Sequence, residues 1–268
     1  MIRQGLLYVI VLIFGLSNVN AQAEYPISIT PIRGLVDSEN YKMVALPSLG
    51  LYFVVGNTLL AATDTSRLLT VTFPEEVYID DIFWNENDFV IKSGKRVYLF
   101  DEIHRPLLEF DVTDFSIFPC DERSIYVARP NGEFCSLYKV NLKLKKARRM
   151  ANLRGCIIDM SKRNGSTWVT TDAGVFRFDK DSCHVMLRTP SPILSATMTR
   201  LGLIYATDSS INYLIDNNAY VSLMKNRGSA LSCDEQNLYF INDANDLVQI
   251  SLQLIELSLK IIEAVPSE

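Results

Sequence analysis

The stretch Cys120-Asp121-Glu122-Arg123-Ser124-Ile125-Tyr126-Val127 has a counterpart in Cys233-Asp234-Glu235-Gln236-Asn237-Leu238-Tyr239-Phe240. Each consists of a polar turn followed by an aliphatic residue, a tyrosine and another apolar residue. The two stretches lie 113 positions apart (233 minus 120). Three units of about 38 residues would fill that interval, so the sequence predicts a tandem repeat.

The repeat signal is a polar or glycine-containing turn followed by a β-forming triplet around an aromatic residue. It occurs six times, with spacings of 37, 37, 42, 37 and 34 residues between the aromatics Tyr52, Phe89, Tyr126, Trp168, Tyr205 and Tyr239. Within units such as 79–111 and 155–189, four short β-forming runs are separated by turns, with almost no helical periodicity. Four short strands per unit are typical of β-propeller blades.

The predicted strands have apolar residues on both faces. Leu51-Tyr52-Phe53-Val54-Val55, for example, lacks the alternation of a half-exposed strand. Such sheets are stable in water only when both faces are covered, which a closed ring of blades achieves. The sequence therefore predicts an all-β fold, a six-bladed β-propeller of four-stranded antiparallel blades over residues 40–264, preceded by a signal peptide.

The two ends of the predicted propeller do not follow the repeat pattern. Within the N-terminal segment 22–39, residues 27–32 are predicted to form an extra strand that joins the first blade to the last. Residues 265–268 are expected to be a tail. Near the C-terminus, apolar residues alternate up to Leu254 and continue from Ile255 on the opposite parity, which favours strands with a hairpin or bulge. The alternative is a helix with Leu247, Ile250, Leu254, Leu257 and Ile261 on one face.

The first 21 residues are typical of a secretory signal peptide. Arg3 precedes a short apolar run at 6–14, and the small residues Ala21 and Ala23 offer cleavage positions. An uncleaved N-terminal anchor is the alternative. No later segment reaches about 18 uncharged apolar residues, so no transmembrane anchor is expected after cleavage. The expected location is the periplasm or outer cell surface of a bacterium.

Composition excludes several classes of function. The 268-residue chain has 26 Lys and Arg against 31 Asp and Glu, and this net charge of −5 argues against a general nucleic-acid binder. Five cysteines without a C-x-x-C pair favour small buried hydrophobes over a disulfide framework or zinc site. The two histidines, His104 and His184, lack metal-ligand spacing and are expected at the surface, so neither a metal site nor a cofactor is predicted.

Two segments resemble known propeller families. The stretch 167–179, in which Trp168-Val169 and Gly174 lead into an aromatic strand ending in Asp179, resembles the propeller repeat in periplasmic sensor regions of bacterial two-component regulators. That resemblance implies a ligand-sensing or interaction propeller. The stretch 161–168 is similar to the sialidase Asp-box, a turn-stabilising device, although Arg163 stands where the box has its Asp and no second copy occurs.

Two groups of residues are candidates for binding or chemistry. Asp81, Asp114 and Asp159 recur where first strands begin, and they could form a partial acidic ring in the central channel. The alternative places them in turns or facing solvent. The basic run is expected in the last hairpin and outer strand of the third unit, where it either discourages edge-to-edge aggregation or docks an anionic partner; it comprises Lys143, Lys145, Lys146, Arg148 and Arg149.

No catalytic constellation follows from residue spacing. The sequence therefore favours an exported, non-enzymatic propeller that binds a protein or glycan partner in the bacterial cell envelope. The alternative is a small carbohydrate-active enzyme, a glycoside hydrolase or lyase, that uses carboxylates at the propeller channel.

Overall fold

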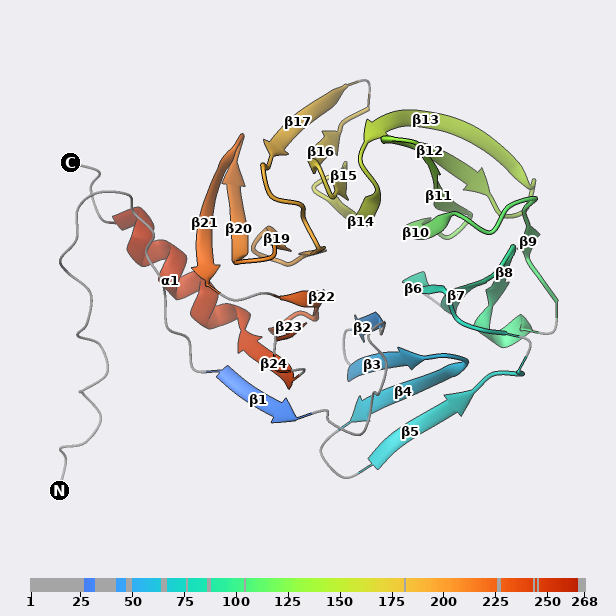
Figure 1. The fold of residues 1–268 in the computed structure, drawn as a ribbon, viewed down its shortest axis with the longest axis horizontal. Helices are drawn as coiled ribbons and strands as arrows, with labels where there is room; N and C mark the ends of the chain where they lie inside the picture. The colour runs from blue at the N-terminus through green and yellow to red at the C-terminus, as the bar shows by residue number, and fades with distance from the viewer. Residues whose placement is uncertain are drawn as a thin grey trace.

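The computed structural model describes residues 27–31, 42–46, 50–63, 67–75, 77–85, 88–103, 105–180, 182–225, 228–242, 244 and 246–264. The expected signal peptide at 1–21 and His104 lie outside the described residues. The described strands form six four-stranded antiparallel sheets arranged around a common centre (Figure 1). This confirms the prediction of a six-bladed β-propeller.

Each of the first five blades uses four consecutive strands. Blade 1 consists of β2 (Lys42–Leu46), β3 (Gly50–Val55), β4 (Thr58–Thr63) and β5 (Arg67–Thr72). Blade 2 consists of β6 (Asp81–Asn85), β7 (Asp88–Ser93), β8 (Arg96–Leu99) and β9 (Leu108–Glu109), with the 3-10 turn η1 (Phe100–Glu102) after β8. Blade 3 consists of β10 (Ser116–Asp121), β11 (Ser124–Asn131), β12 (Phe134–Asn141) and β13 (Lys146–Arg154). Blade 4 consists of β14 (Ile157–Arg163), β15 (Ser166–Thr171), β16 (Gly174–Phe178) and β17 (Cys183–Arg188). Blade 5 consists of β18 (Ser195–Met198), β19 (Leu203–Ala206), β20 (Ile211–Asp216) and β21 (Ala219–Met224).

Blade 6 combines strands from both ends of the chain. It consists of β22 (Ser229–Cys233), β23 (Asn237–Ile241), β24 (Asp246–Ser251) and, as its outermost strand, β1 (Ile27–Pro31). β1 runs antiparallel to β24, from Ile27 opposite Ile250 to Pro31 opposite Asp246. The N-terminal strand thus joins the sheet that the C-terminal strands form, and the ring is closed by backbone pairing.

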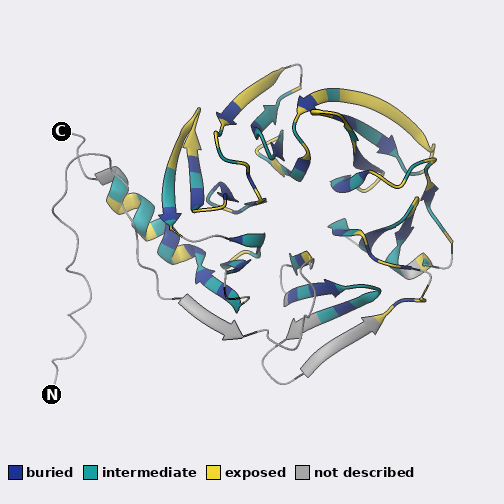
Figure 2. Ribbon diagram, viewed as in Figure 1, coloured by how far each residue is buried: buried dark blue, intermediate teal, exposed yellow. Residues whose placement is uncertain are grey.

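The core is divided among the spaces between neighbouring blades. Among the described residues, six apolar clusters occupy the six blade–blade interfaces. β7 shows how one strand serves two interfaces: Ile91 packs with Val54 of blade 1, and Val90 packs with Ile125 of blade 3. Figure 2 shows the complementary pattern, in which exposed residues gather on outer strands such as β13, β17 and β21. Both faces of each blade are therefore buried, which explains the missing alternation.

The six repeat aromatics lie on equivalent strands, although not all on the same face of their blades. Each lies on the second strand of its blade, namely β3, β7, β11, β15, β19 and β23. Tyr52 and Phe89 of neighbouring blades meet edge to face, with ring centroids 5.6 Å apart. This geometry adds stabilisation beyond burial of apolar area.

The C-terminal segment differs from the favoured strand prediction. After β24 the chain forms a helix, α1 (Leu252–Ala264), so the strands expected beyond Ile255 are wrong. The reason is that β1 already occupies the outer edge of β24, which leaves the segment no sheet edge to pair with. The helix buries Leu252 and Ile255 against the blade 5–blade 6 cluster and exposes Leu257 and Ile261, so its buried face is not the one that the sequence suggested.

All five cysteines are free. Cys120 and Cys135 are buried, Cys233 is half-buried, and Cys156 and Cys183 are exposed. Within the described residues, no helix is long and apolar enough to cross a membrane.

Candidate functional site

The first strand of every blade lies nearest the centre of the ring (Figure 1). Polar side chains on these strands accept hydrogen bonds from backbone amides of the neighbouring blade. Asp81 Oδ2 accepts from the Ile117 amide at 3.0 Å, and Ser195 Oγ accepts from the Leu231 amide at 2.8 Å. The inner edges of the sheets thereby obtain partners for amides that have no strand beside them.

Asp81 accepts hydrogen bonds at both of its carboxylate oxygens. Its Oδ1 accepts hydrogen bonds from Lys42 Nζ at 2.6 Å and from the Ile82 amide at 3.1 Å. Its Oδ2 accepts a hydrogen bond from the Ile117 amide of blade 3. One carboxylate therefore joins the inner strands of three consecutive blades. With both oxygens engaged, its role in this arrangement is to hold the strands together.

We expect Asp81→Asn to lower the free energy of unfolding by about 2 kcal/mol, because one acceptor oxygen becomes an NH2 group that cannot accept. Urea denaturation followed by circular dichroism measures the loss. Asp114→Asn is the matched control, since Asp114 is exposed. Equal stabilities of the two variants would contradict the role of Asp81.

The three carboxylates predicted as a channel ring have different environments. Asp81 is engaged as described above, and Asp114 lies just before β10 and is exposed. Asp159 lies within β14, beside an irregularity in the pairing with β15. In the described part of the chain, no three His, Cys, Asp or Glu side chains are grouped so that they could hold a metal ion.

Asp159 has an unusual carboxyl group. Its Oδ2 atom is buried and has no hydrogen-bond partner among the described residues. Burial raises the pKa of Asp159 from 3.8 to about 7, against the opposing effect of a hydrogen bond from the Met160 amide. A carboxyl group with this pKa is half-protonated at neutral pH and can therefore both donate and accept a proton.

Further unpartnered polar atoms lie on the same face of blade 4 as Asp159. In the pairing of β14 with β15, Asp159 is opposite Thr170 and Ser161 is opposite Trp168. In the pairing of β15 with β16, Trp168 is opposite Arg177. Paired residues of neighbouring strands share a face. The buried atoms Ser161 Oγ, Thr170 Oγ1 and Arg177 Nε lack partners, as Asp159 Oδ2 does. Trp168 packs into the blade 4–blade 5 cluster, so this face looks toward blade 5.

We call this interface the seam, defined by Asp159, Ser161, Thr170, Trp168 and Arg177. Four of the five unpartnered buried side-chain atoms of the described residues belong to it. Buried polar atoms without partners cost about 1–3 kcal/mol each and are rare in folded proteins. Their concentration in one interface marks the seam as the candidate functional site.

A cavity of about 300 Å³ lies between blades 4 and 5. Trp168 and Arg177 line it from blade 4, and Leu203 and Tyr213 line it from blade 5. The seam residues thus reach from the channel strand β14 to a cavity large enough for a small molecule.

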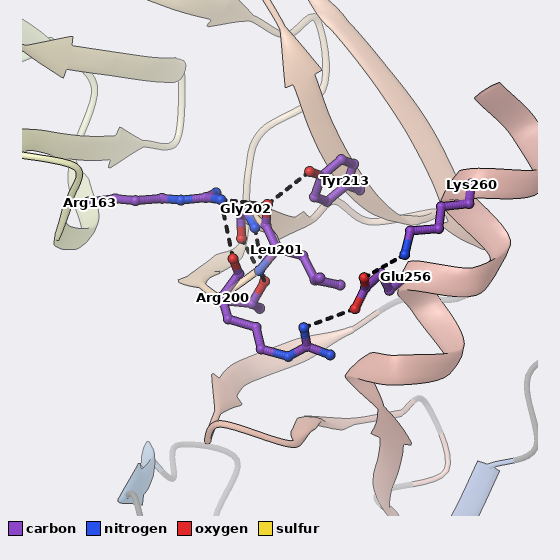
Figure 3. A network of polar contacts seen from close by, with 8 residues as sticks. Arg163, Arg200, Leu201, Gly202, Tyr213, Glu256 and Lys260 are labelled. Carbon is purple, nitrogen blue, oxygen red and sulfur yellow. Dashed lines mark hydrogen bonds and ion pairs between the residues drawn. The ribbon is translucent and has the colours of Figure 1, made fainter.

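Arg163 fixes one wall of this cavity. Figure 3 shows Arg163 reaching from blade 4 to the turn between β18 and β19, where its Nη2 donates to the carbonyls of Arg200 and Leu201 at 3.2 and 2.8 Å. A Cβ on Gly202 would lie 2.9 Å from Arg163 Nη1, so the glycine permits this approach. The residue that departs from the Asp-box pattern is therefore a link between blades.

The same network continues to the C-terminal helix. Arg200 Nη1 contacts Glu256 Oε2 at 2.9 Å, and Glu256 Oε1 contacts Lys260 Nζ at 2.9 Å (Figure 3). Tyr213 also donates to the Leu201 carbonyl, at 3.0 Å. The turn at 200–202 is thereby held from blade 4, from blade 5 and from α1.

The other predicted candidates lie away from the seam. Lys143 and Lys145 lie in or beside the β12–β13 turn, Lys146, Arg148 and Arg149 lie on the outer strand β13, and all five are exposed. His184 lies on β17 and is exposed, with Nε2 at 2.8 Å from Ser182 Oγ. The sequence patterns did not identify Arg177, Ser161 or Thr170 as site residues. The one available signal was Arg177, a charged residue inside a strand of the repeat that follows the blade pattern most closely.

No family model matches this chain, and no curated protein matches it. Among solved structures, a luciferin-regenerating enzyme matches with a TM-score of 0.62 at 11% identity, covering 84% of this chain and 95% of that one. A candidate gluconolactonase matches with a TM-score of 0.62 at 12% identity, covering 84% and 92%. The virginiamycin B lyase of Staphylococcus aureus matches with a TM-score of 0.56 at 12% identity, covering 81% and 83%. This chain shares the six-bladed propeller fold with them.

The comparisons overturn one sequence-based prediction. A non-enzymatic propeller that binds a partner was expected, yet these solved propellers are described as enzymes. The resemblances to two-component-regulator propellers and to the sialidase Asp-box have no support at the level of sequence families.

Proposed function

We propose that this chain is a carbohydrate-active enzyme, a hydrolase or lyase, in which Asp159 transfers the proton. The observation that carries the proposal is the buried Asp159 carboxyl on a channel-lining strand, whose Oδ2 atom has no partner among the described residues and whose pKa burial raises to about 7. Perturbed carboxyl groups of this kind concentrate at catalytic sites. The enzymes among the structurally similar propellers support an enzymatic function.

The environment of the other two channel carboxylates favours chemistry with a single proton-transfer group. Asp81 is bound by Lys42 and two amides, and Asp114 is exposed. In an elimination, ionised Asp159 takes the proton from a carbon next to a carboxyl group of the sugar. The electron pair forms a carbon–carbon double bond, the bond to the oxygen on the next carbon breaks, and Asp159 returns the proton to that oxygen. In a hydrolysis, Asp159 takes the proton from attacking water and gives it to the leaving oxygen.

The test is turnover of three substrate groups by the purified protein: uronate polysaccharides, aldonolactones and nitrophenyl glycosides. We expect turnover of one group, with a pH–rate limb near 7, the pKa that burial gives Asp159. Asp159→Asn should lower kcat about 100-fold or more, since a positioned acid–base group contributes that much. The matched control Asp114→Asn should retain the activity. Lack of turnover with all three groups, or activity that survives Asp159→Asn, would contradict the proposal.

We also propose that the protein is exported to the periplasm or cell surface and works there on or beside a glycan or protein of the envelope. The support is the charged, apolar and small-residue pattern of residues 1–21. The exposed cations of β13 and its preceding turn, Lys143, Lys145, Lys146, Arg148 and Arg149, would hold the enzyme at an acidic surface.

A further inference from the structure

The cavity between blades 4 and 5 has polar side chains at its solvent-exposed rim. Asn164, in the turn between β14 and β15, and Asp216, at the end of β20, line the cavity and are exposed. Neither side chain has a hydrogen-bond partner or an ion pair among the described residues. The rim therefore presents a carboxylate that accepts hydrogen bonds and a carboxamide that both donates and accepts them.

The two arginines that line the cavity are engaged by acceptors of the protein. Arg163 Nη2 donates to two carbonyls of the turn at 200–202. Arg177 Nη2 contacts Asp179 Oδ2 at 3.5 Å. In the described part of the chain, the Asp216 carboxylate has no cationic partner of this kind. Because both guanidiniums have acceptors while this carboxylate is free, the charges around the cavity favour an uncharged ligand over an anion.

Aromatic side chains from both blades line the interior of the cavity. Trp168 lines it from blade 4 and Tyr213 from blade 5, and both are half-buried. The Tyr213 hydroxyl donates to the Leu201 carbonyl at 3.0 Å, which fixes the position of the ring. The buried side chains of Met186 and Leu203 lie beside them. Aromatic walls combined with hydrogen-bonding groups at the rim suit a ligand that has apolar ring faces and polar edges.

We propose that this cavity binds a neutral mono- or disaccharide, with its C–H groups against Trp168 and Tyr213 and its hydroxyls on Asp216 and Asn164. Sugar hydroxyls both donate and accept hydrogen bonds, as this carboxylate and carboxamide require. A volume of about 300 Å³ suits a ligand of this size. The site is separate from the proposed proton-transfer group, because Asp159 does not line the cavity. Sugar binding without turnover would therefore contradict the proposed enzyme and leave this site intact.

Isothermal titration of the wild-type protein with cellobiose, maltose and lactose tests the proposal. We expect at least one of these disaccharides to bind with a Kd of about 5 mM or lower. Glucuronate should bind no more tightly than glucose, since no free cation awaits its carboxylate. In Trp84→Phe the cavity residue Trp168 is the only tryptophan left, and its fluorescence should change with the same Kd. No binding of any disaccharide at about 50 mM, or tighter binding of glucuronate than of glucose, would overturn the proposal.

A pair of variants locates the site. Asp216→Ala should weaken binding of the disaccharide at least about fivefold, because the sugar hydroxyls lose a charged acceptor. Asp208→Ala is the matched control, an exposed aspartate of the same blade that does not line the cavity, and it should bind the sugar like the wild type. Both aspartates are exposed, so neither substitution disturbs the core. Binding that is unchanged in Asp216→Ala would place the sugar elsewhere and overturn the assignment.

Discussion

At about pH 8, Asp159→Asn is expected to raise the free energy of unfolding by about 4 kcal/mol, while at about pH 4 the two proteins should be equally stable. The pKa of Asp159 is raised from 3.8 to about 7 in the folded protein because the carboxyl is buried. Each pKa unit corresponds to about 1.4 kcal/mol. Asn resembles the protonated acid and never carries the buried charge.

The sign follows from which state binds the proton more tightly. Below a pH of about 4, Asp159 is protonated in both the folded and the unfolded chain, so its favourable contribution is fully present. As the pH rises from the unfolded pKa through about 7, the unfolded chain ionises first and the wild type loses stability. The Asp159→Asn variant has no ionisable group at this position, so its free energy of unfolding does not fall for this reason.

Urea denaturation of wild type and variant at several pH values between about 4 and about 8 measures the effect. Asp114→Asn serves as the control, since the exposed Asp114 should give a difference that hardly varies with pH. A constant difference for Asp159→Asn, or a variant less stable than the wild type at the upper pH, would show that the charge is not buried. A gain in stability with loss of activity is the usual signature of a functional group.

Gly174→Ala is expected to lower the free energy of unfolding by about 3 kcal/mol or more. Gly174 begins β16 with a φ of +156°, and an added Cβ would lie 2.3 Å from the carbonyl oxygen of Leu187. That oxygen belongs to the backbone of β17, so relief requires the outer strands of blade 4 to separate.

The variant Gly165→Ala distinguishes the cost of an unfavourable backbone conformation from the cost of a steric clash. Gly165 has a φ of +78°, but a Cβ there would meet nothing within 4 Å, so only the left-handed backbone penalises alanine, by about 1–2 kcal/mol. Thermal and urea denaturation of both variants give the comparison. If Gly174→Ala costs no more stability than Gly165→Ala, the close approach of β17 to Gly174 is wrong.

Much of the fold follows from local patterns that the ring geometry repeats. The aromatics from Tyr52 to Tyr239 mark the second strand of each blade because each of them packs in an interface beside its blade, with either the preceding or the following blade. The helix α1 could not be inferred in this way. Its segment alternates like a strand, but whether a strand forms depends on whether a sheet edge is free, and the distant strand β1 occupies that edge.

The candidate site was only partly predictable. Asp81, Asp114 and Asp159 have similar positions in the sequence, yet their environments are set by residues of other strands and blades. Asp81 is bound by Lys42 and Ile117, which lie 39 and 36 positions away. Asp159 Oδ2 has no such partner. Burial and partners arise only when the blades pack, so residue spacing could not distinguish Asp81, which joins the inner strands, from Asp159, the proposed proton-transfer group.

The pKa of the Asp159 side chain tests the central claim most directly. Carbon NMR of the protein labelled at the aspartate carboxyl carbons follows each group through a pH titration. We expect one aspartate to titrate at about 7 and its resonance to be missing from Asp159→Asn. Titration of every aspartate below a pH of about 5, as expected for solvated carboxyl groups, would contradict a buried proton-transfer group at the seam.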